Sequence, residues 1–187
     1  MNRRNVLALV PVVLVAAACG TQGDLVPEFS KVAHTTPVVQ ATPVPTSTAE
    51  VTVKREWTVP ALVTGVRYAR HKGFDRVVID LKKAMPGYTA RWVKKLTYDG
   101  SGNPVKAKGK AYLSLTLAWA RAHDENTAKP TWKGGPIFKA DLGNITHVVN
   151  TGDFEGQVGV GLVLKRKAAF RITELKKPYR LVIDVAH

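Results

Sequence analysis

The feature that most constrains the fold of this chain is a strand-like motif that occurs twice, as RVVIDL at residues 76–81 and as RLVIDV at residues 180–185. The correspondence continues upstream, because Arg67 and Arg171 each stand nine positions before the arginine that opens the motif. Successive side chains of a strand point to opposite faces, so each motif presents three apolar side chains on one face. We expect two related hairpins that pack against each other in a pseudo-symmetric β-sandwich. The alternative is a chance similarity between two β-rich strands.

Further stretches alternate in the same way and are separated by turn residues. The densest turn cluster is DGSGNP at residues 99–104, in which Asp, Gly, Asn and Pro each favour a turn. No sustained helical period occurs, and short strands at regular spacing are typical of a sandwich. We therefore expect residues 57–187 to form an all-β domain of two related small antiparallel sheets. The predicted strands are residues 62–70, 74–81, 88–98, 111–120, 145–149, 157–164, 170–175 and 179–185.

Residues 1–18 have the composition of a secretory signal peptide. Arg3 and Arg4 give a positive start, and Val6 to Ala18 is an uncharged, almost wholly apolar run that ends in small residues, which is the arrangement of such a signal. This run of 13 residues is too short to cross a bilayer, which takes about 20.

Cys19 is the only cysteine of the chain and directly follows this run. The sequence AAAC at residues 16–19 resembles a lipobox, in which the cysteine is diacylated and becomes the mature N-terminus, although lipoboxes most often carry leucine where this chain has Ala16. Two acyl chains anchor a protein stably where one does not. We expect a lipid anchor at Cys19 that holds the protein at the outer face of the cytoplasmic membrane. The alternative is cleavage at an Ala-x-Ala site, which leaves a soluble secreted protein.

Residues 19–56 are expected to combine this lipidated N-terminus with a tether rich in proline and threonine. Pro37, Pro43 and Pro45 favour an extended, polyproline-like backbone, so the stretch is predicted to be a semi-rigid spacer. Its expected role is to hold the domain of residues 57–187 away from the membrane.

The chain is strongly basic, and this limits the classes of partner. Without the two arginines of residues 1–18, it has 26 lysines and arginines against 14 aspartates and glutamates, a net charge of +12. Outside the cytoplasm such a charge favours anionic envelope polymers and phospholipid head groups over nucleic acid. Because the basic clusters are dispersed along the chain, the alternative is a solvated basic surface without a dedicated binding stripe.

Three segments resemble a known family of envelope proteins. They are residues 65–81 (GVRYARHKGFDRVVIDL), 152–162 (GDFEGQVGVGL) and 170–185 (FRITELKKPYRLVIDV). These segments are similar to the AMIN-like domain of actinobacterial envelope lipoproteins, relatives of the AMIN module that targets cell-wall amidases and secretins. The resemblance covers about residues 57–187. It implies a sandwich of two related small sheets and non-catalytic binding to peptidoglycan.

The sequence offers few of the parts that an enzyme needs. It contains no nucleophile-elbow, zincin or phosphate-loop motif, and its five histidines show no metal-ligand spacing. Residues 123–126 (HDEN) are either a hard-cation site or, as we expect, a solvated acidic turn. Asp153 and Glu155 are candidates for a carboxylate pair that hydrolyses glycans, but neither has an apolar setting. We therefore predict a protein that is not an enzyme, with no cofactor and no metal.

The candidate binding residues are aromatic and arginine side chains. Trp132 lies in a long polar loop and is expected to be an exposed aromatic, whereas Trp92 and Trp119 lie on strand faces and are expected in the core. The outward arginines are expected either to contact peptide-stem carboxylates or to form cross-strand ion pairs with Asp80 and Asp184. The predicted ligand-binding residues are Trp132, Arg67, Arg76, Arg171 and Arg180.

Together these observations predict an envelope-anchored, non-catalytic module that binds peptidoglycan or an associated anionic wall polymer. The alternative is a protein-interaction scaffold in which an exposed edge strand pairs with a cell-wall enzyme or a secretion component. The expected partners are a cell-wall glycan or anionic polymer, the membrane through the lipid anchor and, in the alternative, other envelope proteins. No nucleic acid is expected.

Overall fold

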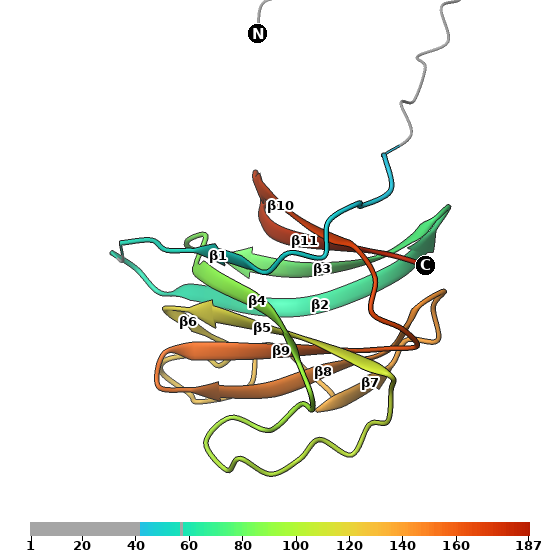
Figure 1. Ribbon diagram of the computed structural model, residues 1–187. Coiled ribbons are helices and arrows are strands. Elements are labelled where there is room, and N and C mark those ends of the chain that lie inside the picture. The colour runs from blue at the N-terminus through green and yellow to red at the C-terminus, as the bar shows by residue number, and fades with distance from the viewer. Residues whose placement is uncertain (1–41, 57) are drawn as a thin grey trace, which may run out of the picture. The chain divides into compact units, whose positions relative to one another are not determined.

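The computed structural model describes residues 42–56 and 58–187. Within these residues the chain forms eleven strands and no helix, and the strands make two sheets that lie face to face (Figure 1). The expected all-β sandwich is therefore confirmed. No helix of the described part is long and apolar enough to cross a membrane. The strands are β1 (Val51–Val53), β2 (Ala61–His71), β3 (Phe74–Lys82), β4 (Gly87–Val93), β5 (Ala111–Ala118), β6 (Ala120–Arg121), β7 (Ile137–Lys139), β8 (Ile145–Phe154), β9 (Gln157–Leu164), β10 (Phe170–Lys176) and β11 (Tyr179–Ala186).

The core lies between a six-stranded and a five-stranded sheet. The first has the order β1-β4-β5-β9-β8-β7, and the second has the order β10-β11-β3-β2-β6, in which β2 and β6 are parallel. Leu113, Leu115 and Leu117 of β5 are at most 3% exposed and belong to one apolar cluster with side chains of β3 and β11. The inward faces predicted for the repeated motif are confirmed, since all of their apolar side chains are buried: Val77, Ile79, Leu81, Leu181, Ile183 and Val185.

The two copies of the motif are β3 and β11, which lie side by side in the interior of the five-stranded sheet (Figure 1). They run antiparallel with Val78 opposite Val182, so that the arginine of each motif stands opposite the aspartate of the other. The hairpins β2–β3 and β10–β11 are thus joined edge to edge in one sheet and are related by a pseudo-two-fold axis between these valines. The expectation that these hairpins belong to two related sheets and pack against each other across the sandwich is therefore wrong. Alternation identifies the buried face of a strand but not its neighbours in the sheet.

The chain changes sheet directly after β5, at Trp119. This residue has a positive φ of 57°, which ends the extended backbone and with it the alternation of side chains. Its carbonyl accepts a hydrogen bond of 2.9 Å from the amide of Ala61 in β2, and Ala120 then begins β6. The side chain of Trp119 is 41% exposed, so the expectation that it lies in the core is wrong.

Residues 42–56, which the sequence assigned to the tether, belong to the same compact unit as the sandwich. β1 pairs with β4 at the edge of the six-stranded sheet. Just before β1, the carbonyl of Ser47 accepts a hydrogen bond of 2.7 Å from the Phe170 amide, and the carbonyl of Thr48 accepts one of 3.0 Å from Nε1 of Trp92. The segment therefore contacts both sheets. The predicted signal peptide and Cys19 lie outside the described residues.

Candidate functional site

The outer face of the five-stranded sheet carries the polar side chains of the repeated motif. On one half of this face the carboxylate of Asp184 is buried, with 2% of its side chain exposed. Arg76 donates from Nε and Nη2 to its two oxygens, at 2.6 and 2.9 Å, and Nη2 of Arg171 donates to Oδ2 at 2.8 Å. Burial by itself would raise the pKa of Asp184, but the hydrogen bonds and charges of the two arginines hold it below its ordinary value. Asp184 is therefore fully paired within the chain.

The symmetry-related carboxylate, Asp80, is paired differently. It accepts two hydrogen bonds from Arg67, of 2.7 Å from Nε and 2.8 Å from Nη2, and 33% of its side chain is exposed. Arg180 stands directly opposite Asp80 in the pairing of β11 with β3. Within the described residues, the side chain of Arg180 makes no hydrogen bond or ion pair, and its Nε is buried without a partner.

Arg180 lines a groove of about 360 Å³ on this face, which we call the arginine groove. Three guanidinium groups, from Arg67, Arg76 and Arg180, stand around it, and Val78 and Val182 of the central strands give it an apolar floor. Guanidinium groups present forked pairs of donors that match the oxygens of carboxylates and phosphates. The groove thus has the chemistry of an anion site with an apolar surface beside it.

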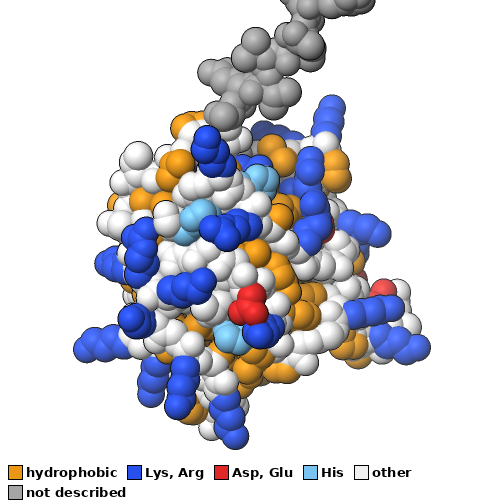
Figure 2. Space-filling view, turned by 90° about the vertical axis from the view of Figure 1, so that its right-hand side faces the viewer, with side chains coloured by type: hydrophobic (Ala, Val, Ile, Leu, Met, Phe, Trp, Pro, Cys, Tyr) orange, Lys and Arg blue, Asp and Glu red, His pale blue; other side chains and the backbone are white. Residues whose placement is uncertain are grey.

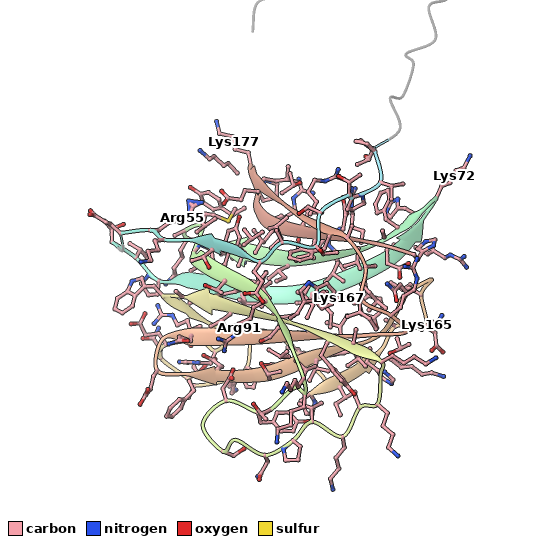
Figure 3. The ribbon with its side chains drawn as sticks, viewed as in Figure 1. Arg55, Lys72, Arg91, Lys165, Lys167 and Lys177 are labelled. Carbon is pink, nitrogen blue, oxygen red and sulfur yellow. The ribbon has the colours of Figure 1, made fainter. Side chains whose placement is uncertain are left out.

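Basic side chains extend the positive charge beyond the groove. Lys72 and Lys177 stand at the β2–β3 and β10–β11 turns, which flank the outer face (Figure 3). On the side of the molecule shown in Figure 2, lysines and arginines are spread widely and few acidic groups lie between them. On this side the charge is therefore not gathered into one stripe.

Three of the four predicted site arginines lie together in the structure, and the fourth lies apart from them. Arg67, Arg76 and Arg180 come together at the arginine groove, whereas Arg171 is turned to Asp184 and to the carbonyl of Pro43, at 3.0 Å. The cross-strand ion pairs that the sequence offered as an alternative are present for three of the four arginines. Arg180 is the exception.

Trp132, the other predicted site residue, is only 4% exposed, so the expectation of an exposed aromatic is wrong. Its loop folds back onto the sandwich, where the hydroxyl of Thr131 donates to the Val63 carbonyl at 2.6 Å. Trp132 then enters the core and stacks on Phe138, with ring centroids 5.5 Å apart. Trp92 is partly buried and packs against the core as expected.

A histidine–carboxylate pair that the sequence did not indicate closes this loop. Nδ1 of His123 lies 2.5 Å from Oδ2 of Asp153, which also accepts a hydrogen bond of 2.8 Å from the Ala122 amide. The residues that line the hollow beside the pair include no serine, threonine or cysteine, so the histidine has no nucleophile there to activate. The partner of Asp153 is thus His123 of the loop, while Glu155 lies exposed in the β8–β9 turn. The two residues are 30 positions apart in the sequence, so no local sequence pattern predicts their pairing.

The acidic stretch at residues 123–126 is arranged as a turn. Asp124 accepts hydrogen bonds from the amide and hydroxyl of Thr127, at 2.9 and 2.8 Å, and Glu125 pairs with Arg121 at 2.6 Å. Among the residues that the structure describes, no group of three or more His, Cys, Asp or Glu side chains is placed to hold a metal ion.

Comparison with known proteins agrees with this architecture. Residues 61–187 match the model of the AMIN-like domain family, a domain that is generally a non-catalytic module of the cell envelope. A search among curated proteins found no match. The family match spans more than half of the chain and includes both hairpins of the repeated motif. The chain therefore belongs to the AMIN-like domain family.

Proposed function

We propose that this domain binds peptidoglycan, or an anionic polymer associated with it, without catalysing a reaction, and that the arginine groove is its binding site. The observation that carries the proposal is the state of Arg180, which lines the groove and has no partner in the described chain. A buried polar group without a hydrogen bond costs roughly 1–3 kcal/mol. A ligand that accepts hydrogen bonds from the Arg180 guanidinium removes this unfavourable free energy.

The charge of the protein supports the same function. A net charge of +12 without residues 1–18, with Lys72 and Lys177 at the two hairpin turns of the five-stranded sheet (Figure 3), attracts polyanions and raises their local concentration. Long-range attraction of this kind is weakened by salt, whereas direct hydrogen bonds to a guanidinium are weakened much less. The salt dependence of binding therefore distinguishes specific binding at the groove from non-specific attraction by charge.

The proposal includes a lipid anchor at Cys19 that holds the protein at the outer face of the cytoplasmic membrane. Its support is the signal-like composition of residues 1–18, the position of the only cysteine directly after them, and the association of AMIN-like domains with the cell envelope. The domain would then meet the inner surface of the wall.

The test is co-sedimentation of the chain from residue 20 onward with purified sacculi, with and without their anionic polymers, over a salt series. We expect retention on stripped sacculi at physiological ionic strength, where charges further apart than about 8 Å are screened. Arg180→Gln is expected to lower retention. The matched control is Arg91→Gln, because Arg91 is an exposed arginine on the other sheet (Figure 3). Retention that vanishes at physiological salt and falls equally in both variants would contradict the proposal. Retention that is lost only when the polymer is removed, and that falls in Arg180→Gln but not in Arg91→Gln, would assign the polymer as the ligand.

The alternative of a scaffold that offers an edge strand has less support. Of the edge strands, β1 and β7 have three residues each and β6 has two, and short edges discourage pairing with another chain. β10 is longer, but the amide of Phe170 at its start already donates to Ser47. Binding to an envelope protein with no retention on sacculi would favour the scaffold.

A further inference from the structure

The two halves of the outer face differ in one respect. Asp184 is held by Arg76, which stands opposite it, and by Arg171 of the neighbouring strand β10. By the pseudo-two-fold axis, Asp80 would be held by Arg180 opposite it and by Arg67 of β2. Only the second of these pairs is present. One guanidinium of the symmetric set is therefore left without a carboxylate in the described chain.

A difference in register accompanies this asymmetry. Arg171 lies opposite Asp184 itself, whereas Arg67 lies opposite Val78 and reaches Asp80 diagonally. From there its Nε and Nη2 contact both oxygens of Asp80, the two-bond geometry typical of arginine and carboxylate. Asp80 thus has a donor for each oxygen already, and Arg180 remains available in the groove.

The surroundings of Arg180 indicate which anion it takes. Val78 and Val182 beside it are 8% and 6% exposed, and Leu175 of β10 adds further apolar surface to the groove. A polymer of phosphate and polyol has no apolar group to cover this floor. A carboxylate that ends a short peptide of small apolar residues has both parts, because its methyl groups lie within reach of the charged end.

We propose that Arg180 binds the terminal carboxylate of a short apolar peptide, with the side chains of that peptide against Val78 and Val182. The choice of the wall as the source of this peptide rests on the proposed function. The inference goes beyond it by assigning the group that is bound and the residue that binds it.

The experiment is an NMR titration of the chain from residue 20 onward with N-acetyl-alanyl-alanine, its C-terminal amide and glycerol phosphate, observing the Nε–Hε signals of the arginines. For so small a peptide we expect a dissociation constant on the order of 1 mM. The acid should shift the Arg180 signal, and the amide should bind about ten-fold or more weakly. Arg180→Gln should lose the affinity for the acid by about the same factor, and Arg180→Lys should fall well short of the wild type because a lysine lacks the planar fork. Arg91→Gln is the charge-matched control and should bind as the wild type does.

Equal binding of acid and amide, or wild-type affinity in Arg180→Gln, would overturn the assignment. Glycerol phosphate that binds more tightly than the acid and shifts the Arg180 signal would replace the carboxylate by a phosphate and would also overturn it. Retention on sacculi without any shift by the acid would remove this inference and leave the proposed function intact. A shift by the acid without retention on sacculi would support the carboxylate site and remove the wall as its source.

Discussion

Arg76 and Asp184 face each other across the pairing of β3 and β11 and are joined by two hydrogen bonds of 2.6 and 2.9 Å, although they are 108 positions apart in the sequence. The pair fastens the first hairpin of the repeated motif to the second. It lies on the outer face of the sheet, yet only 2% of the aspartate side chain is exposed. Because the carboxylate is buried, a change that removes its charge would leave two guanidinium groups without their partner.

Asp184→Asn is expected to lower the free energy of unfolding by about 2–4 kcal/mol, because it leaves Arg76 and Arg171 without a charged partner on a partly buried face. Urea unfolding with an unchanged m-value measures this loss. The matched control is Asp141→Asn, which breaks the exposed pair of Lys139 and Asp141 and is expected to have no measurable effect. Equal losses in the two variants would mean that the removed charge, and not the buried pair, is responsible.

The stability of the wild type is also expected to fall in acid because of Asp184. Its pKa is lowered in the folded state from the ordinary value of 3.8, so its contribution is present above about pH 4 and is lost as the pH falls through the lower folded value. The midpoint of urea unfolding, followed from pH 6 downward, should decline less steeply in Asp184→Asn than in the wild type. Parallel acid profiles would refute this assignment.

Tyr88 is expected to make the protein less stable in alkali. Its hydroxyl is 3.1 Å from Glu174 Oε1, and burial, followed by the charge of this carboxylate, raises its pKa from 10.0 to about 12. The folded state keeps the proton longer than the unfolded state, so stability is complete below pH 10 and is lost between about pH 10 and 12. Tyr88→Phe should show a shallower loss over this interval in urea unfolding. An unchanged slope would show that other groups cause it.

Gly159→Ala is expected to destabilise the six-stranded sheet by about 1–3 kcal/mol through overpacking. A Cβ atom at this position of β9 would overlap with Oγ1 of Thr151 and with the carboxylate of Asp99. Gly65→Ala in β2 is the control, because a Cβ atom there would meet nothing within 4 Å. Thermal unfolding of the two variants compares them directly. A loss in Gly65→Ala as large as that in Gly159→Ala would exclude the steric explanation.

Cys19→Ser is expected to move the protein from the membrane fraction to the soluble fraction and to abolish its labelling with an alkyne-tagged fatty acid. The companion variant is Ala16→Leu, which supplies the residue that lipoboxes most often carry and should keep the protein labelled. Membrane fractionation with detergent phase partition measures both. Continued labelling of Cys19→Ser would rule out this anchor.

The sequence was sufficient to predict the faces of the strands. The alternation in residues 76–81 and 180–185 correctly placed the apolar side chains inward and the arginines and aspartates outward. The register of Val78 with Val182 could not be derived, because period-two alternation is satisfied by any neighbour on either edge. The same limit applies to the site. The pattern placed Arg180 outward, but its lack of a partner depends on how Arg67 reaches Asp80 from another strand.

The two errors over tryptophans have different physical causes. Trp119 follows the period of β5, but its positive φ of 57° ends the strand before the period can apply. Trp132 lies in a polar loop, and the loop is drawn inward by hydrogen bonds to residues far away in the sequence, such as that from Thr131 to Val63. Local composition predicts neither the positive φ of Trp119 nor the tertiary hydrogen bond that places the loop of Trp132.

The pairing of β11 with β3 also has a consequence for the order in which the sheet can form during synthesis. Val78 and Val182 are paired although they are 104 positions apart in the sequence. β3 therefore cannot pair with β11 until the ribosome has synthesised the second motif. At about 5–20 residues per second, that takes roughly 5–20 s. During this interval the five-stranded sheet lacks β11 and β10 and is incomplete. The long separation of β3 and β11 in the sequence therefore makes completion of this sheet one of the last steps in the synthesis of the domain.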